Sequence, residues 1–259
     1  MESYLHQLQS EIQDKHWWFR GRRHLIEFFL STEPALKGSR QKAIGDTAYA
    51  FQNSWFERVL EVGCGTGPNS SVLEKMGSKL IGVDPDTDAL KRAAHEHKIK
   101  GDGRALPFGS EVFDLVLALD VLEHSADDVA LAGELRRVTR REGKVLVFVP
   151  ALPILWGIQD ELSHHKRRYT KKSLVGVLER AGLYISRVSY FNTWLFLPIL
   201  AVRLLCRYSG RSGGVRSENE WTPAWLNGPL TAIFRSEALV LRHMNLPVGV
   251  SLMALATPI

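Results

Sequence analysis

The sequence is poor in cysteine and in long apolar runs. Only Cys64 and Cys206 occur among 259 residues, far apart and outside any metal-ligand spacing, which argues for a reducing compartment and against a disulfide scaffold. We therefore expect no metal site. The most apolar segment, 194–206, contains Arg203 and is shorter than the roughly 20 residues of a membrane-spanning helix. Because the first 15 residues also lack the apolar stretch of a signal peptide, we expect a cytoplasmic protein.

No charge of one sign dominates the chain. Lysine and arginine number 33 and aspartate and glutamate 28, for a net charge of +5 and a sequence pI near 9.2. This excess is too small, and too dispersed into several clusters, to indicate a nucleic-acid-binding stripe. With 45% hydrophobic and 24% charged residues, the composition is that of an ordinary globular protein.

Short apolar runs alternate with helical spacing from residue 58 onward, as in successive βαβ units. Strands are expected at 58–62, 79–83, near 99, 113–118, 144–149, 183–190 and 248–256. Helices are expected at 69–76, 88–97, 130–138 and 171–181. The pattern predicts an α/β fold with a mostly parallel seven-stranded sheet.

Two further regions flank or interrupt this sheet. Residues 1–57 begin with a helical stretch that is aromatic and basic at its centre, followed by a polar linker. The core is expected over 58–191, and 248–259 supplies its final strand. Between them lies a helical insertion, 192–247, which contains the apolar segment 194–206 and the amphipathic stretch 230–243.

The strongest chemical signal is a glycine-rich turn directly after the first expected strand, where residues 59–67 read VLEVGCGTG. Gly63 and Gly65 permit positive φ and close approach of a ligand to the backbone. Glu61, just before them, can hold the turn or meet a cationic ligand. Asp84 ends the next strand, where an acid can accept hydrogen bonds from ribose hydroxyls. The spacing Gly-x-Gly-x-Gly differs from the Gly-x-Gly-x-x-Gly of dinucleotide enzymes, so an adenosyl ligand other than a dinucleotide is favoured.

These residues resemble the first motifs of the class I S-adenosylmethionine-dependent methyltransferases. Residues 101–108, which read GDGRALPF, are similar to the next motif of that family, and 113–124 to its fourth strand and following turn. The resemblance implies a Rossmann-like class I methyltransferase fold with S-adenosyl-L-methionine as cofactor. It implies that Asp102 meets the adenine amino group and that the Gly103 backbone meets a ring nitrogen. The chain also resembles a bacterial subgroup with an aromatic-Arg N-terminal helix and a His-x-Arg-Arg-Tyr segment, here 165–169.

Residues for the acceptor side are expected at the carboxyl ends of the strands, where open α/β sheets bind ligands. Asp120 can reach the methionine part of the cofactor, or can instead cap a helix. His124 is the best candidate for a catalytic base, since imidazole titrates near neutrality; a packing histidine is the alternative. In segment 164–169, His165 and Tyr169 are further catalytic candidates, and Arg168 is a candidate ligand for an anionic acceptor. A solvated basic loop that caps the next helix is the competing interpretation. The arginines at 136, 137, 140 and 141 are expected on one helix, away from the cleft, as a solvated face.

The N-terminal helix is a candidate lid. Trp18 can exclude water or face a sulfonium, and Arg20 can bind a carboxylate of the acceptor; an ordinary packing helix is the alternative. The insertion can cap the substrate or touch a membrane surface through 194–206, because aromatic, leucine and basic residues occur there together.

The predicted function is methyl transfer to a small-molecule or lipid-linked acceptor, at oxygen or carbon, by in-line displacement. A non-catalytic cofactor-binding partner subunit and, with less support, an NAD-dependent oxidoreductase stay open. Nucleic acid is not an expected acceptor, since the chain lacks the Asn/Asp-Pro-Pro-aromatic tetrapeptide of enzymes acting on base amino groups. The acceptor's identity and the oligomeric state are not encoded in any motif.

Overall fold

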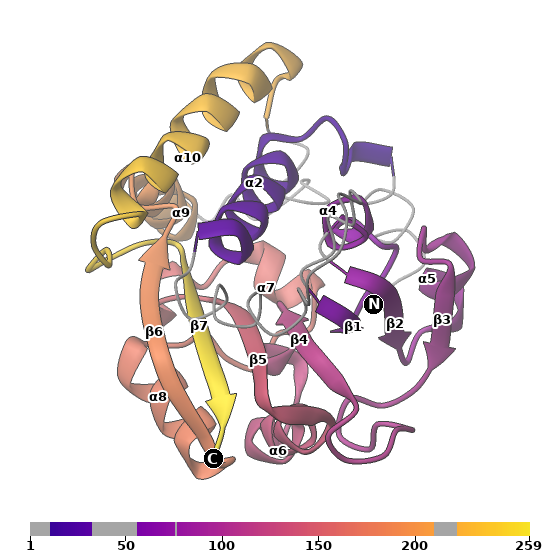
Figure 1. Cartoon of the computed structure of the whole chain (residues 1–259). Helices are drawn as coiled ribbons and strands as arrows, with labels where there is room; N and C mark the ends of the chain where they lie inside the picture. The colour runs from indigo at the N-terminus through magenta and orange to yellow at the C-terminus, as the bar shows by residue number, and fades with distance from the viewer. Residues whose placement is uncertain (1–10, 33–55, 76, 210–221) are drawn as a thin grey trace.

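The sheet at the centre of the molecule has the expected class and strand number. The computed structural model describes residues 11–32, 56–75, 77–209 and 222–259 (Figure 1). Within them, one seven-stranded sheet has the order β3-β2-β1-β4-β5-β7-β6. Strands β1 to β5 run parallel, and β7 lies antiparallel between β5 and β6. The strands are β1 Phe56–Val62, β2 Gly77–Asp84, β3 His97–Lys100, β4 Phe113–Leu119, β5 Thr139–Pro150, β6 Leu183–Phe191 and β7 Ser251–Pro258.

Helices connect the strands and form the flanking regions. They are α2 Trp17–Thr32, α4 Ser70–Leu73, α5 Thr87–Arg92, α6 Asp128–Val138, α7 Ile158–Leu162, α8 Lys171–Arg180, α9 Phe196–Ser209 and α10 Asn227–Leu241. Short 3₁₀ turns occur at η2 Leu122–His124, η3 Pro153–Leu155 and η5 Ala224–Leu226. None of the helices in the described ranges is long and apolar enough to cross a bilayer.

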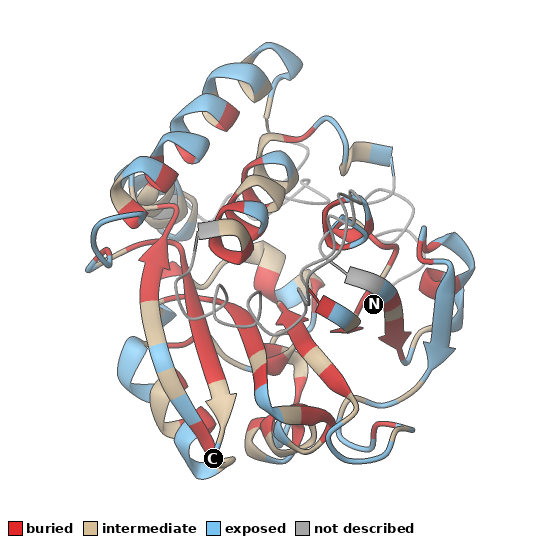
Figure 2. Ribbon diagram, viewed as in Figure 1, coloured by how far each residue is buried: buried red, intermediate tan, exposed pale blue. Residues whose placement is uncertain are grey.

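Successive side chains of each strand point to opposite faces of the sheet, so the molecule has two apolar cores, one on each face. On β4, Val116 and Ala118 belong to the core covered by α6 and α8, whereas Leu115 and Leu117 belong to the core covered by α2, α4 and α10. Figure 2 shows the central strands buried along most of their length. Each buried Leu or Val contributes roughly 1.5–3 kcal/mol, so the two apolar cores fix the sheet between its helical layers.

Helices α2 and α10 lie side by side although they are far apart in sequence (Figure 1). Gly21 permits this contact, because a Cβ there would lie 2.1 Å from Cδ1 of Phe234. Trp17 donates its backbone N–H to Asn227 at 2.9 Å. Glu237 of α10, fully buried, accepts the backbone N–H of Trp194 at 2.9 Å. The N-terminal helix and the insertion are therefore packed onto the sheet and onto each other.

Three local expectations from the sequence are wrong. Helix α5 ends at Arg92 and not at residue 97, because Ala93 adopts an extended conformation and β3 begins at His97. Helix α4 ends at Leu73, so it is a single turn. Arg140 and Arg141 lie in β5 and not on the preceding helix, since Thr139 is already extended.

The arginine cluster therefore does not form one solvated helical face. Arg140 pairs with Asp114 of the neighbouring strand. Arg137, on α6, donates to the carbonyls of Phe108 and Leu106 at 2.7 and 3.0 Å and so holds the preceding turn.

Candidate functional site

The glycine-rich turn between β1 and α4 has the backbone conformation that its glycines predict. Gly63, Gly65 and Gly67 have φ values of +68°, +52° and +78°. The N–H groups of Gly63 and Cys64 both donate to the Val83 carbonyl, at 2.7 and 3.1 Å, and tie the turn to β2. A Cβ on Gly63 would lie 2.5 Å from Cγ2 of Val121, whereas a Cβ on Gly65 would meet no protein atom within 4 Å. The turn is thus held by its neighbours at Gly63 and open to a ligand at Gly65.

Two carboxylates support this turn in different ways. Glu61 is buried, accepts a hydrogen bond from Asn69 Nδ2 at 2.8 Å and lies 2.8 Å from His95 Nε2. It therefore holds the turn from within the core. Asp84 accepts the backbone N–H of Gly65 at 2.8 Å through Oδ2 and lies at the cavity wall.

One cavity of about 700 Å³ runs along the carboxyl ends of β1, β2, β4 and β5. Gly63, Gly65 and Asp84 line one end, and His124, His165 and Arg168 line the other. Trp17, Trp18 and Arg22 of α2 and Arg203 of α9 also line it. The structure thus brings together segments from the N-terminal helix, the core and the insertion.

Arg22 is a functional candidate that the sequence interpretation missed. Its side chain is buried, pairs with Asp120, and lies 5.7 Å from the Trp18 ring centroid and 5.6 Å from that of Phe148. Its Nε and Nη2 have no hydrogen-bond partner among the described residues. Arg20, the predicted ligand, is exposed and outside the cavity lining. The available signal was helical periodicity, since Trp18 and Arg22 are four residues apart and share a face.

Asp120 occupies the end of β4 as expected but does not cap a helix. Its φ is +58°, a left-handed conformation that costs a non-glycine residue energy and often marks functional sites. The cap position of η2 belongs to Val121. Asp120 lines the cavity and forms an ion pair with Arg22.

The histidine end of the cavity is built around two buried carboxylates, Glu123 and Asp160. His165 donates Nδ1–H to Asp160 Oδ1 at 2.8 Å, and its Nε2 lies 3.9 Å from Glu123 Oε1. Arg168 Nε also donates to Asp160, at 2.9 Å. Burial alone would raise the pKa of Asp160, but the hydrogen bond from His165 and the charge of Arg168 outweigh it and lower that pKa. Asp160 is therefore an ionised anchor for His165 and Arg168.

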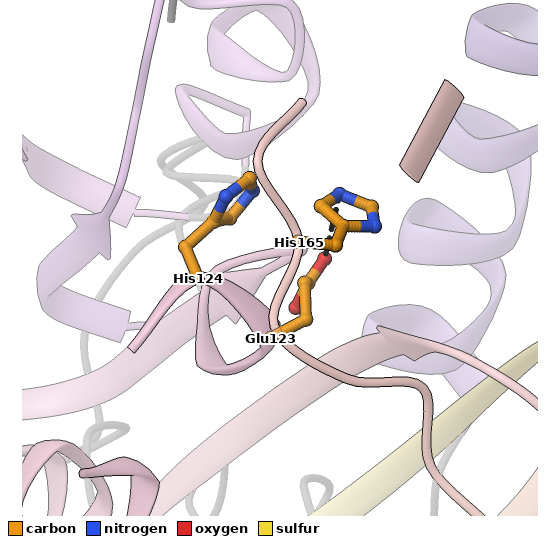
Figure 3. A group of neighbouring side chains, drawn as sticks. All are labelled: Glu123, His124 and His165. Carbon is orange, nitrogen blue, oxygen red and sulfur yellow. Dashed lines mark ion pairs between the residues drawn. The ribbon is translucent and has the colours of Figure 1, made fainter. Parts of the chain in front are cut away.

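His124 and His165 meet edge to face, with ring centroids 4.7 Å apart (Figure 3). Burial, together with the neighbouring His165, lowers the pKa of His124 to about 4. The imidazole of His124 is thus neutral at pH 7. Burial and nearby Asp120 raise the pKa of Glu123, whose two carboxylate oxygens have no hydrogen-bond partner among the described residues.

Five predicted site residues lie outside the cavity lining: Glu61 and Arg20, described above, and Tyr169, Asp102 and Gly103. Tyr169 is buried, donates its hydroxyl to Asp128 at 2.8 Å, and burial raises its pKa. Asp102 is half-exposed and paired with Arg104 at 2.7 Å, which lowers the pKa of Asp102. Gly103 packs its Cα toward Val62, where an added Cβ would lie 3.1 Å away. Tyr169 therefore ties the segment after α7 to α6, and neither Asp102 nor Gly103 lines the cavity.

Comparison with known proteins supports a methyltransferase. Residues 60–147 match the family model described as a methyltransferase domain. An uncharacterized methyltransferase from Mycolicibacterium vanbaalenii is 35% identical over 41% of this chain and 45% of its own length. A demethylmenaquinone methyltransferase from Corynebacterium kroppenstedtii is 30% identical over 40% of this chain and 48% of its own. The chain thus spans about half the length of these curated relatives.

The fold is also found in a solved structure, that of a candidate methyltransferase from Bacillus halodurans. It superposes with a TM-score of 0.53 at 20% identity, covering 86% of this chain and 97% of the other. The chain has the Rossmann-like class I methyltransferase fold.

Proposed function

We propose that this chain is an S-adenosylmethionine-dependent methyltransferase that acts on a small-molecule or lipid-linked acceptor by in-line transfer to oxygen or carbon. The observation that carries the proposal is the single cavity that joins the glycine turn and Asp84 to the histidine end. When bound, S-adenosylmethionine supplies a methyl group that its sulfonium already activates. The protein therefore has to bind, orient and exclude water, and such positioning can contribute up to roughly 7–11 kcal/mol.

The residues at the β1–β2 end suit an adenosyl ligand. Gly65 leaves open space where a side chain would otherwise stand, and Asp84 presents a carboxylate at the tip of β2. Asp120 is our candidate for the methionine part. Asp102 can bind the adenine amino group only after its ion pair with Arg104 breaks. The assignment of Asp102 and Gly103 to the adenine is therefore still a prediction.

The opposite end favours an acceptor that carries a negative charge or a polar oxygen. Arg22, whose Nε and Nη2 find no hydrogen-bond partner in the part of the chain that the structure describes, lines the cavity, and Arg168 contributes a second cationic side chain. His124 and His165 are the catalytic candidates. The neutral imidazole of His124 can accept a hydrogen bond from an acceptor hydroxyl and hold its oxygen in place. Trp18 also lines the cavity, and we propose that its ring excludes water from the acceptor.

A hydrophobic or lipid-linked acceptor is supported by two observations. One relative is named for a quinone substrate, demethylmenaquinone. Helix α9 also leaves large apolar side chains exposed, with Leu197 and Leu205 at 70% and 69% of their full accessibility. We propose that this face contacts a membrane surface while the acceptor enters the cavity.

Methyl transfer is tested by incubating the purified chain with S-adenosylmethionine labelled in its methyl group, together with bacterial lipid extract or aqueous extract. Label in the lipid fraction supports the lipid-linked acceptor, and label in the aqueous fraction only supports a small polar one. Bound cofactor without transfer to either extract contradicts the enzyme and favours a cofactor-binding partner subunit. Binding of NAD in place of S-adenosylmethionine would favour an oxidoreductase.

Membrane contact is tested by sedimentation with phosphatidylglycerol vesicles. The double variant Leu197→Ser, Leu205→Ser should lose vesicle binding, because it removes apolar area without touching the cavity. Tyr184→Ser, which alters an exposed aromatic residue on β6, is the matched control and should bind as the wild type does. Equal, negligible binding by all three proteins contradicts the membrane proposal.

A further inference from the structure

Glu123, His124 and His165 form a compact set of metal-ligating side chains at the acceptor end of the cavity. One ligand atom from each lies within 4.8 Å of the others. Figure 3 shows the Glu123 carboxylate reaching toward the His165 ring, with the His124 ring beside them. The first two residues belong to η2 and the third to the loop after α7. We propose that these three residues bind one divalent first-row transition-metal ion, of the class of Zn²⁺.

Glu123 gives the strongest reason to expect a metal ion at this position. It is fully buried, and neither carboxylate oxygen has a hydrogen-bond partner among the described residues. A buried carboxylate without partners is costly, and buried charges in proteins are normally paired or bound to a metal. A cation between Glu123 and the two imidazoles would satisfy the carboxylate.

The outer contact of His165 is that of a metal ligand. Asp160 accepts the Nδ1–H of His165 at 2.8 Å, which leaves the Nε2 lone pair directed to the Glu123 side. Carboxylate–histidine pairs of this kind orient metal ligands and fix their tautomer. The Lys166 N–H donates to the Glu123 carbonyl at 2.8 Å and fastens the His165 loop to η2.

The distances fit a zinc-like ion after a small closure. Two ligands on a tetrahedral zinc ion stand about 3.4 Å apart, from bond lengths of roughly 2.0–2.2 Å. His165 Nε2 and Glu123 Oε1 are 3.9 Å apart, and all three ligand atoms lie within 4.8 Å of one another. The ligand atoms therefore have to approach one another by between about 0.5 and 1.4 Å to surround the ion. Two imidazoles and one carboxylate suit zinc or iron better than magnesium or calcium.

Three protein ligands leave a coordination position open, as in catalytic metal sites. Because His124 and His165 line the cavity, that position would face the acceptor and take an oxygen of a hydroxyl or carboxylate. The metal site stands independently of methyl transfer, whereas this role for the acceptor oxygen rests on the proposed function.

Binding is measured by titrating the metal-free full chain with Zn²⁺ against a chromophoric chelator. We expect one equivalent per chain, with affinity reduced roughly 100-fold in His165→Ala and in Glu123→Gln. Asp160→Asn, which alters the partner of a ligand, should lose about 10- to 100-fold. His243→Ala, at an exposed position after α10, should match the wild type. Wild-type affinity no greater than that of His165→Ala would overturn the proposal.

X-ray absorption of the wild-type chain with one equivalent of Zn²⁺ provides a measurement that needs no variant. Two imidazole ligands and oxygen at about 2.0–2.2 Å are expected. Sulfur ligation by a cysteine, or a shell without histidine, would contradict the site. Calorimetry with S-adenosylhomocysteine tests the cofactor end separately, so failure of the metal site and failure of the methyltransferase proposal are distinguishable.

Discussion

At its β1–β2 end the cavity is formed largely by backbone, whereas at its η2–α7 end it is formed by side chains that depend on one another. Gly63 and Gly65 occupy a turn fixed by hydrogen bonds to β2 and Asp84. His165 and Arg168 are positioned through one carboxylate, that of Asp160. A site made from backbone leaves a local sequence pattern, while a site made from distant side chains does not. Substitutions should therefore act locally at the first end and through the network at the second.

The largest effect is expected from Asp160→Ala. The variant leaves Arg168 buried without its carboxylate and removes the partner of His165, and breaking a buried pair of this kind costs about 3–5 kcal/mol. Urea denaturation of the variant and of Asp88→Ala measures it. Asp88 pairs on the surface with Lys91, and its loss should cost within about 0.5 kcal/mol. Equal stability of the two variants would mean that the Asp160 network does not hold this end together.

The glycine turn is tested by Gly63→Ala against Gly65→Ala. Both positions have positive φ, which costs an alanine roughly 1–2 kcal/mol. Only Gly63 also gains a clash, with Val121, so its variant should lose roughly 1–3 kcal/mol more. Gly65→Ala should fold yet bind S-adenosylhomocysteine weakly, since its methyl group enters open space at the cavity. Thermal unfolding and calorimetry separate the two effects, and full binding by Gly65→Ala would contradict the assignment of that space to the cofactor.

A smaller effect is expected from Asp84→Ala. Loss of a charged hydrogen-bond acceptor should weaken cofactor binding by about 1–3 kcal/mol, measured by calorimetry. Asp102→Ala should weaken it less, because Asp102 must first release Arg104. The reverse order would show that the turn 101–105 rearranges around the adenine.

The smallest effect concerns pH and the lid helix. Burial lowers the pKa of His16 to about 4, below the 6.5 of an exposed histidine. The unfolded chain therefore takes up this proton first, so stability is complete above pH 6.5 and falls as pH decreases toward 4. His124 contributes in the same window. Between pH 7 and pH 5, the free energy of unfolding measured in urea should fall less for His16→Gln than for the wild type. An equal fall in both proteins would mean that His16 is exposed to solvent in the folded state.

The sequence predicted the sheet because its strands are continuous apolar runs bounded by turns, as at 113–118. It also predicted the glycine turn and Asp84, since both sit at fixed distances from a strand end. Helix ends are harder to predict. Alanine is the best helix former, so Ala93 gives no local sign that α5 ends at Arg92 and that residue 97 lies in a strand.

The acceptor end could not be derived from local patterns. His124, His165 and Arg168 do line the cavity, as their positions after strands suggested. Arg22 was missed in favour of Arg20 because packing against both the sheet and α10 decides which face of α2 is buried, and Arg22 lies on that face, against Asp120 and Phe148. Tyr169 lies in the same segment, but its hydroxyl donates to Asp128, a partner 41 residues away that no local pattern reveals.

The central claim, that the cavity takes an adenosyl sulfonium, is tested most directly by calorimetric titration of the purified full chain with S-adenosylmethionine and S-adenosylhomocysteine. We predict saturable binding of both ligands at one site per chain, weakened by Asp84→Ala. Absence of binding heat for both ligands across several temperatures would contradict the account.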